Sequence, residues 1–127
     1  MAQRKNPNTS TKRKMSEMIL EMGAGIVDAG ETVDDRQNRL NATCTAWNMA
    51  CVTSIVRQKQ LEQYREGYLR HNPDTSPTDL ANINKDMELL IDRKLKMFLN
   101  DKRQIVSARS VRIGANFRIE IACATFQ

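Results

Sequence analysis

The sequence predicts a mainly α (α+β) fold: a helical hairpin or small bundle, followed by a C-terminal two-stranded β-hairpin. Two observations carry this prediction. Between Met15 and Lys102, apolar residues recur every three or four positions, which is the period of a helix that buries one face. From Val111 onwards the period changes to two, which is typical of β-strands. The chain of 127 residues, 40% hydrophobic and 28% charged, has the size and composition of one folded domain.

The charge of the chain is concentrated at its N-terminus. Residues 1–14 hold five basic side chains and no acidic one, so they account for the whole net charge of +5. This composition predicts a flexible basic arm, followed by a single helical domain over residues 15–127. Within that domain, residues 15–35 carry six acidic side chains and no basic one, whereas residues 93–118 carry eight basic and one acidic. The basic residues of the arm are Arg4, Lys5, Lys12, Arg13 and Lys14.

Two helices are predicted after the arm. The first begins at Met15 and ends at Gly30, because glycine is favoured directly after a helix. Thr32 is then well placed as the N-cap of a long second helix over residues 33–70, with Asp35 at the capping-box spacing. The predicted buried line of this second helix is Leu40, Cys44, Trp47, Cys51 and Ile55.

A third helix follows the segment HNPDTSPTD, in which two prolines separate one helix from the next. Ser76 is placed as its N-cap and Pro77 as its first residue, and the helix is predicted over residues 77–102. Its core stripe is Leu80, Ile83, Met87, Leu90, Ile91, Lys94 and Phe98, with the aliphatic stem of Lys94 at one edge.

The C-terminal segment VRIGANFRIEIACATF predicts a β-hairpin at about residues 105–125. Its strands are expected over residues 105–113 and 117–125, with Gly114 to Asn116 as the turn. The alternation places two sets of side chains on opposite faces: Val111, Ile113, Phe117, Ile119, Ile121 and Cys123 on one, and Arg112, Arg118 and Glu120 on the other.

The predicted elements also bear on assembly. A helix over residues 33–70 would be ~57 Å long, whereas a compact domain of this size has a radius of gyration of ~14 Å. The helix is therefore either broken or projects beyond a compact body. A lone two-stranded hairpin is marginal in water, so it must lie on the helices or pair with strands of another copy. Both arguments favour self-association or membership of a larger complex.

No motif predicts catalysis. The glycines of MGAGIVDAG suggest a dinucleotide loop, but that loop follows a strand and has the spacing G-x-G-x-x-G. Here a helix precedes, so Gly23 and Gly25 are interpreted as residues of helix packing or a kink. Arg65 and His71 match a loose spacing of some helical ribonucleases, yet residues six apart lie on opposite sides of a helix. We expect no catalytic residues, no metal site and no cofactor, because the three cysteines and one histidine include no local pair of ligands.

Further expectations concern the cellular environment of the protein and the role of its single tryptophan. Three cysteines without a disulfide framework predict a reducing, cytoplasmic environment. No apolar run approaches the ~20 residues that a membrane span requires, so no membrane partner is expected. Trp47 is predicted to anchor the helices, with a stacking platform for a base or ligand as the alternative.

The basic residues are the strongest functional signal. We expect a small non-enzymatic binding and assembly protein, which self-associates through the helices over residues 33–70 and 77–102. Contact with nucleic acid would come from the basic arm. One alternative is an adaptor or structural subunit of a larger complex, such as a virion or genome-packaging component, without nucleic-acid contact. Another is a small helical nuclease-like enzyme using Arg65 and His71. The predicted phosphate-binding residues are Arg4, Lys5, Lys12, Arg13, Lys14, Arg103, Arg109, Arg112 and Arg118.

Overall fold

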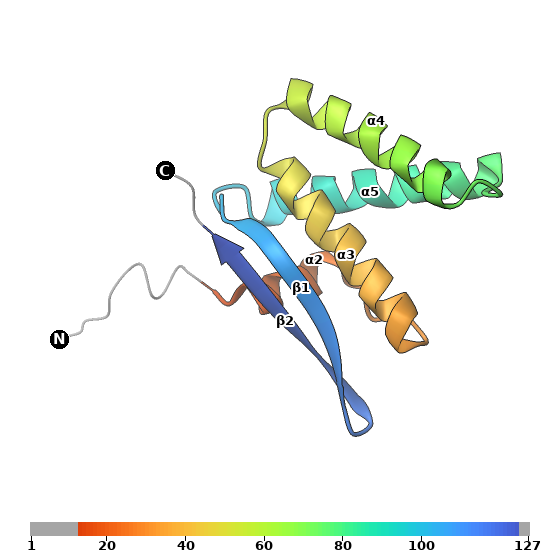
Figure 1. Ribbon diagram of the computed structural model, residues 1–127. Helices are drawn as coiled ribbons and strands as arrows, with labels where there is room; N and C mark the ends of the chain where they lie inside the picture. The colour runs from red at the N-terminus through yellow and green to blue at the C-terminus, as the bar shows by residue number, and fades with distance from the viewer. Residues whose placement is uncertain (1–12, 125–127) are drawn as a thin grey trace.

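The computed structural model describes residues 13–124 (Figure 1). This part of the chain holds four helices followed by an antiparallel two-stranded hairpin, which confirms the predicted mainly α class. In chain order the elements are α2 (Met15–Met22), α3 (Val33–Ala50), α4 (Ser54–His71), α5 (Pro77–Met97), β1 (Gln104–Ile113) and β2 (Asn116–Ala124).

Helix α2 is shorter than predicted. It ends at Met22, and its C-cap is Gly23 rather than Gly30. Both glycines allow close packing. A Cβ atom on Gly23 would lie 3.2 Å from the Thr43 side chain on α3, which confirms its predicted packing role. A Cβ atom on Gly30 would lie 2.8 Å from the Cα atom of Arg36. Gly30 therefore lets the chain pass close to the first turn of α3.

The single helix predicted over residues 33–70 is broken into α3 and α4. Thr53 is the N-cap of α4, and its side chain accepts a hydrogen bond from the amide of Val56. The Arg57 guanidinium folds back and donates to the carbonyls of Met49 and Val52, at 3.1 and 2.9 Å. These contacts satisfy the end of α3 and fix the change of direction. Ile55, predicted on the buried line, is consequently 74% exposed, and Cys51 is half-buried.

Helix α5 begins where it was predicted. The Ser76 side chain accepts a hydrogen bond from the amide of Asp79, and Pro77 is the first helical residue. The helix ends at Met97 instead of Lys102, because Lys94 donates to the carbonyl of Phe98 and to the turn that follows. Four residues of the predicted core stripe are buried, namely Met87, Leu90, Ile91 and Lys94.

The hairpin has the predicted position but a different register. The turn consists of Gly114 and Ala115, so Ile113 pairs with Asn116. Pairing then sets Val111 opposite Arg118 and Arg112 opposite Phe117. Val111 and Ile113 therefore lie on the face opposite to Phe117, and Arg112 lies on the same face as Phe117, so the predicted faces were wrong for these three residues. A turn one residue shorter shifts the register by one and turns one strand over relative to the other.

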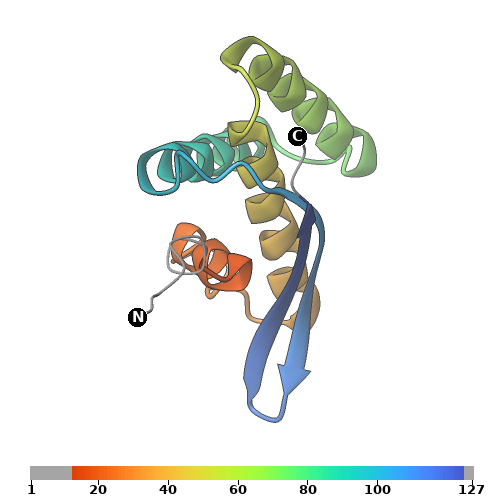
Figure 2. The same cartoon turned by 90° about the vertical axis from the view of Figure 1, so that its left-hand side faces the viewer.

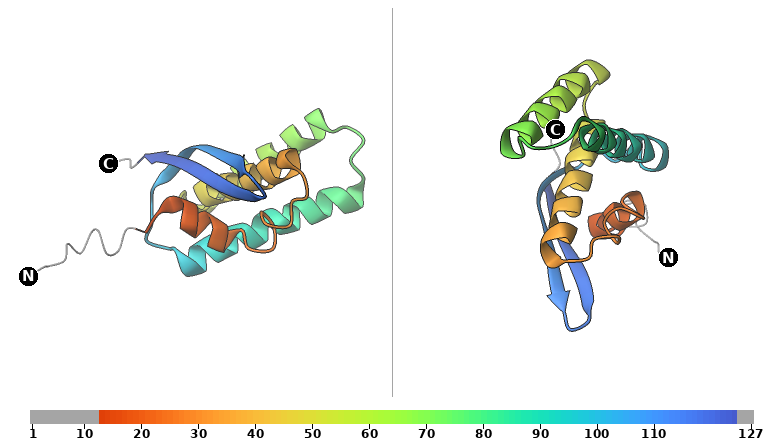
Figure 3. Two further views of the ribbon diagram at one scale, coloured as in Figure 1. Left: turned by 90° about the horizontal axis from the view of Figure 1, so that it is seen from below. Right: turned by 90° about the vertical axis from the view of Figure 1, so that its right-hand side faces the viewer.

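The core lies around α3, which stands between the hairpin on one side and α2 and α5 on the other (Figure 3). Helix α4 has no buried residue and reaches the core only through partly buried side chains such as Leu61 and Tyr64. The most completely buried large apolar side chains are Ile19, Met22, Leu40, Trp47, Met87 and Leu90.

Two amide side chains of α3 bind the backbone of β1. The Gln37 side chain donates to the carbonyl of Ala108 (3.0 Å) and accepts from the amide of Ser110 (2.7 Å). Asn48 makes the same pair of bonds with the carbonyl and the amide of Ile105, at 2.9 and 2.8 Å. These bonds satisfy backbone groups that β2 does not reach, so α3 covers the outer edge of β1.

Candidate nucleic-acid interface

The basic arm is described only at its C-terminal end. Arg4, Lys5 and Lys12 lie outside the described residues. Arg13 and Lys14 are exposed and lead directly into α2. The Arg13 guanidinium forms an ion pair with Glu21, which raises the pKa of Arg13 above its ordinary value. One of the two described arm residues is thus already paired with an acidic side chain of the domain.

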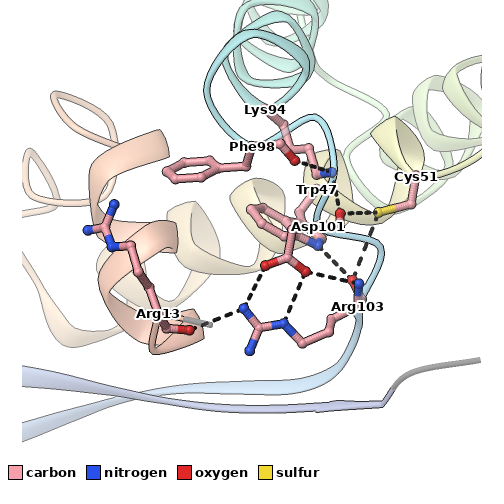
Figure 4. A network of polar contacts seen from close by, with 7 residues as sticks. All are labelled: Arg13, Trp47, Cys51, Lys94, Phe98, Asp101 and Arg103. Atoms are coloured by element: carbon pink, nitrogen blue, oxygen red, sulfur yellow. Dashed lines mark hydrogen bonds and ion pairs between the residues drawn. The ribbon is translucent and has the colours of Figure 1, made fainter. Parts of the chain in front are cut away.

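Arg103 lies in a network of polar contacts rather than on a free surface (Figure 4). Its guanidinium donates to both carboxylate oxygens of Asp101, at 3.0 and 2.6 Å, and to the carbonyl of Arg13 at 3.1 Å. Its side chain is 17% exposed. Burial alone would raise the pKa of Asp101, but the hydrogen bonds from Arg103 outweigh it and lower that pKa. A phosphate contact from Arg103 would require this ion pair to open.

The same network holds a buried lysine whose importance the sequence did not show. The Lys94 ammonium donates to the carbonyls of Phe98 (2.8 Å) and Asp101 (2.5 Å), and it lies 4.7 Å from the centre of the Trp47 ring. Burial lowers the pKa of Lys94 and raises the pKa of the neighbouring Cys51 thiol. A thiol with a raised pKa is a poor nucleophile. The network therefore closes the end of α5.

The other three predicted arginines lie on the hairpin. Arg109 and Arg118 flank Glu120 on the outer face, at 2.5 and 2.9 Å, and their side chains are 70% and 60% exposed. The hydrogen bond from Arg109 and the positive charges lower the pKa of Glu120. Arg112 is exposed beside the turn and donates to the carbonyl of Gly114. The strands therefore bring two exposed arginines, Arg109 and Arg118, together around one carboxylate, and Arg112 lies on the other face of the hairpin beside the turn.

A fourth arginine, which the sequence did not single out, adjoins the hairpin from α3. The Arg36 guanidinium lies 4.0 Å from the centre of the Phe117 ring and donates to the carbonyl of Gly30. Arg112 lies 6.0 Å from the same ring. Phe117 is half-buried, so these arginines cover much of the ring. Only the pairing of distant segments reveals this contact, since Arg36 and Phe117 are far apart in the sequence.

The hairpin carries a disproportionate share of the charge. Residues 13–124 hold 17 basic and 15 acidic side chains, a net charge of +2. The hairpin, residues 104–124, holds three arginines and one glutamate, which is also +2. Its tip extends beyond the helices (Figures 1 and 2). The rest of the described residues therefore have no net charge. The net positive charge of residues 13–124 lies on the projecting hairpin.

The residues of the alternative nuclease hypothesis are not brought together. The ring Nδ1 of His71 lies 2.9 Å from the carbonyl of Gly67, a contact within the last turn of α4. Arg65 lines a hollow between α4 and α5 with Glu62 and Glu88, and no hydrogen bond joins it to His71 in the described part of the chain. Among residues 13–124, no three His, Cys, Asp or Glu side chains are grouped closely enough to hold a metal ion.

Trp47 and the helices bear on the remaining alternatives. Trp47 is fully buried and its ring lies 5.8 Å from that of Phe98, so it has no face free for stacking.

Over residues 13–124, none of the helices combines the length and apolar character that crossing a membrane requires. The chain matches no protein-family model, no curated protein and no solved structure.

Proposed function

We propose that this chain is a small non-enzymatic binding and assembly protein, which self-associates and contacts nucleic acid through its basic arm and the arginines of its hairpin. The observation that carries the nucleic-acid part is the hairpin itself. Arg109, Arg112 and Arg118 are exposed on a projecting element, and the rest of the described domain is neutral. We leave Arg103 out of the interface, because its guanidinium is committed to Asp101.

The chemistry favours contact with phosphates over contact with bases. Arginine binds phosphate through charge and paired N–H donors, and each phosphate contact releases counterions. Stacking on bases requires exposed aromatic rings. Phe117, the aromatic residue of the hairpin, is half-buried between Arg36 and Arg112. We therefore expect affinity that depends strongly on salt and weakly on sequence.

Removing the hairpin charges is expected to weaken nucleic-acid binding. In the triple variant Arg109→Gln, Arg112→Gln and Arg118→Gln, the affinity for a DNA or RNA duplex should fall by about tenfold or more at low salt. The slope of log affinity against log salt should become shallower by about 2 to 3, because each lost phosphate contact removes roughly 0.9. Fluorescence anisotropy over a salt series measures both quantities.

A matched control and a truncation make this test specific. The control removes three exposed basic residues of α4, in the variant Lys59→Gln, Arg65→Gln and Arg70→Gln, and should retain most of the affinity. Deleting residues 2–12 should weaken binding further, through loss of Arg4, Lys5 and Lys12. An unchanged affinity of both the triple variant and the truncated chain at low salt would contradict the nucleic-acid proposal.

The self-association part rests on the helices. Helix α4 has no buried residue, and it leaves Ile55 74% and Val56 44% exposed. On α5, Leu89 is 44% exposed. Apolar side chains left in water on long helices are suited to contact with another copy.

Placing a charge on this helical surface is expected to weaken self-association. Ile55→Asp should shift a sedimentation dilution series towards monomer, because the carboxylate would have to be buried at the interface. An acidic residue in the first turn of a helix is favourable, so α4 itself should tolerate the change. Gln63→Asp, an exposed polar position of the same helix, is the control. Equal behaviour of the two variants would argue against a helical interface.

The adaptor hypothesis is the second candidate, and one observation bears on it. It requires the acidic segment 15–35 and the basic segment 93–118 to pair between subunits. Within one chain, Arg93 donates to the carbonyls of Met22 and Ala24, both at 2.9 Å. These segments therefore already meet inside one copy. Salt-sensitive oligomers that are not retained on a polyanion column would favour the adaptor over the nucleic-acid proposal.

A further inference from the structure

The helices cover one edge of the β-hairpin, that of β1, and leave the edge of β2 uncovered. On the outer edge of β1, the Gln37 side chain bonds to the backbone of Ala108 and Ser110. Because these bonds lie on the outer side, Ala108 and Ser110 direct their backbone groups away from β2. Their partners Ile121 and Ile119 must likewise direct theirs away from β1, since antiparallel pairs alternate in this way.

The outer edge of β2 therefore presents the amides and carbonyls of Phe117, Ile119 and Ile121. Within residues 13–124, no backbone or side-chain hydrogen bond reaches these groups from outside the hairpin. Figure 2 views the molecule from the side of this edge, and no helix crosses in front of β2. β2 has no proline, and its two charged residues, Arg118 and Glu120, lie on the outer face, so no charge points inward along this edge. An uncovered edge of this length is a template for another strand.

We propose that β2 pairs antiparallel with β2 of a second copy of this chain, with Ile119 opposite Ile119 of that copy. The pairing joins two hairpins into one four-stranded sheet. In this sheet Phe117, Ile119 and Ile121 of each copy, whose backbone groups point away from β1, exchange backbone hydrogen bonds with the other copy. This proposal rests on the self-association part of the proposed function. It adds the edge of β2 as a contact surface separate from the helices.

Charge selects this register over its neighbours. With Ile119 at the centre, Arg118 of each copy lies opposite Glu120 of the other, twice per pair, and these are non-hydrogen-bonded positions whose side chains approach closely. Centring the pair one residue later would set Glu120 against Glu120. Centring it one residue earlier would set Arg118 against Arg118. Like charges directly opposite one another are unfavourable, so the register at Ile119 is the complementary one.

The inner face of this edge is apolar. In the proposed register Phe117 lies opposite Ile121 of the other copy, so apolar side chains meet along the inner face of the seam. Beside the edge is a hollow of about 240 Å³ between α2 and β2, whose lining combines four apolar and four polar residues: Leu20, Val27, Phe117 and Ile119 with Ser16, Glu17, Arg36 and Arg118. Leu20 is 46% exposed there. A second copy on this edge would remove apolar surface from water.

Amide hydrogen exchange tests the proposal without any substitution. As the concentration rises through the association range, protection of the amides of Phe117, Ile119 and Ile121 should increase about tenfold or more. The amides of Arg118 and Glu120 already bond to β1 and should change little. If the protein associates while the three outward amides keep the same protection, the edge pairing is wrong but self-association stands. If the protein stays monomeric at every concentration, both proposals are wrong.

A charge reversal tests the register. Arg118→Glu sets a carboxylate against Glu120 of the other copy, and Glu120→Arg sets a guanidinium against Arg118 of the other copy. Each variant alone should therefore dimerise about tenfold more weakly by sedimentation. An equimolar mixture of the two variants should recover the affinity, because both opposite positions then carry opposite charges. Ser107→Glu, on the outer face of β1 away from the seam, is the control and should leave association unchanged. Failure of the mixture to recover, or equal weakening by the control, would overturn the register.

Discussion

Replacing Trp47 with alanine is expected to lower the free energy of unfolding by about 3–5 kcal/mol, the range found for large aromatic residues in a close-packed core. Trp47 is fully buried in the last turn of α3. Its ring packs against Phe98, and the Lys94 ammonium lies 4.7 Å from the ring centre. Its indole N–H donates to the carbonyl of Arg103 at 2.8 Å. The substitution therefore creates a cavity and also releases the connection between α3 and the segment that enters β1.

A second substitution separates these two causes. Trp47→Phe keeps most of the aromatic volume but removes the indole donor, and should cost about 1–3 kcal/mol, because the Arg103 carbonyl loses its partner. Urea unfolding followed by circular dichroism measures both variants, since the protein has a single tryptophan and its fluorescence is lost in each. Equal losses for phenylalanine and alanine would show that the hydrogen bond, rather than the packed volume, dominates.

Replacing Lys94 with methionine is expected to lower the free energy of unfolding by about 2 kcal/mol. Methionine keeps the apolar stem that packs beside Trp47 but leaves the carbonyls of Phe98 and Asp101 without their ammonium donor. Those carbonyls end α5 and shape the turn into β1. Relief of the buried charge offsets part of the loss, which keeps the expected effect below that of Trp47→Ala.

Lys96 provides the matched control for this prediction. It lies two residues further along α5, 74% exposed, in a surface ion pair with Asp92. Lys96→Met should change the free energy of unfolding by no more than about 0.5 kcal/mol. Comparable losses from both substitutions would contradict the role assigned to Lys94.

The pH dependence of the Lys94 variant follows from the sign of its pKa shift. Burial lowers the pKa of Lys94 below its ordinary value of 10.5. Between the folded pKa and 10.5, the unfolded chain binds more protons at this residue than the folded protein, so its contribution to stability rises with pH. The deficit of Lys94→Met relative to the natural chain should accordingly be larger at about pH 10 than at about pH 7. A deficit that shrinks over this range would show that the pKa is not lowered.

The sequence by itself determined the class of fold and the starts of α2, α3 and α5. Helical and strand periods are repeated many times along the chain, and the caps at Thr32 and Ser76 depend on residues three positions away. The positive charge of the arm is likewise a property of composition. These features were predictable because the interactions that cause them are local.

The ends of the helices and the faces of the strands were decided by tertiary structure. The break before α4 depends on Arg57 folding back onto the end of α3. The strand faces depend on a turn of two residues rather than three, and a difference of one residue turns a strand over. The periodicity alone continues through both places, so it could not locate either change.

The candidate interface was likewise predicted in part from the sequence and decided in part by the tertiary structure. The sequence shows four arginines after residue 102 with equal standing, but the fold places Arg103 in an ion pair with Asp101 and leaves Arg109, Arg112 and Arg118 exposed on the hairpin. It also buries Lys94 and exposes the outer edge of β2. The charge of a side chain follows from its identity, but its freedom to meet a partner depends on distant segments, which only folding brings into contact.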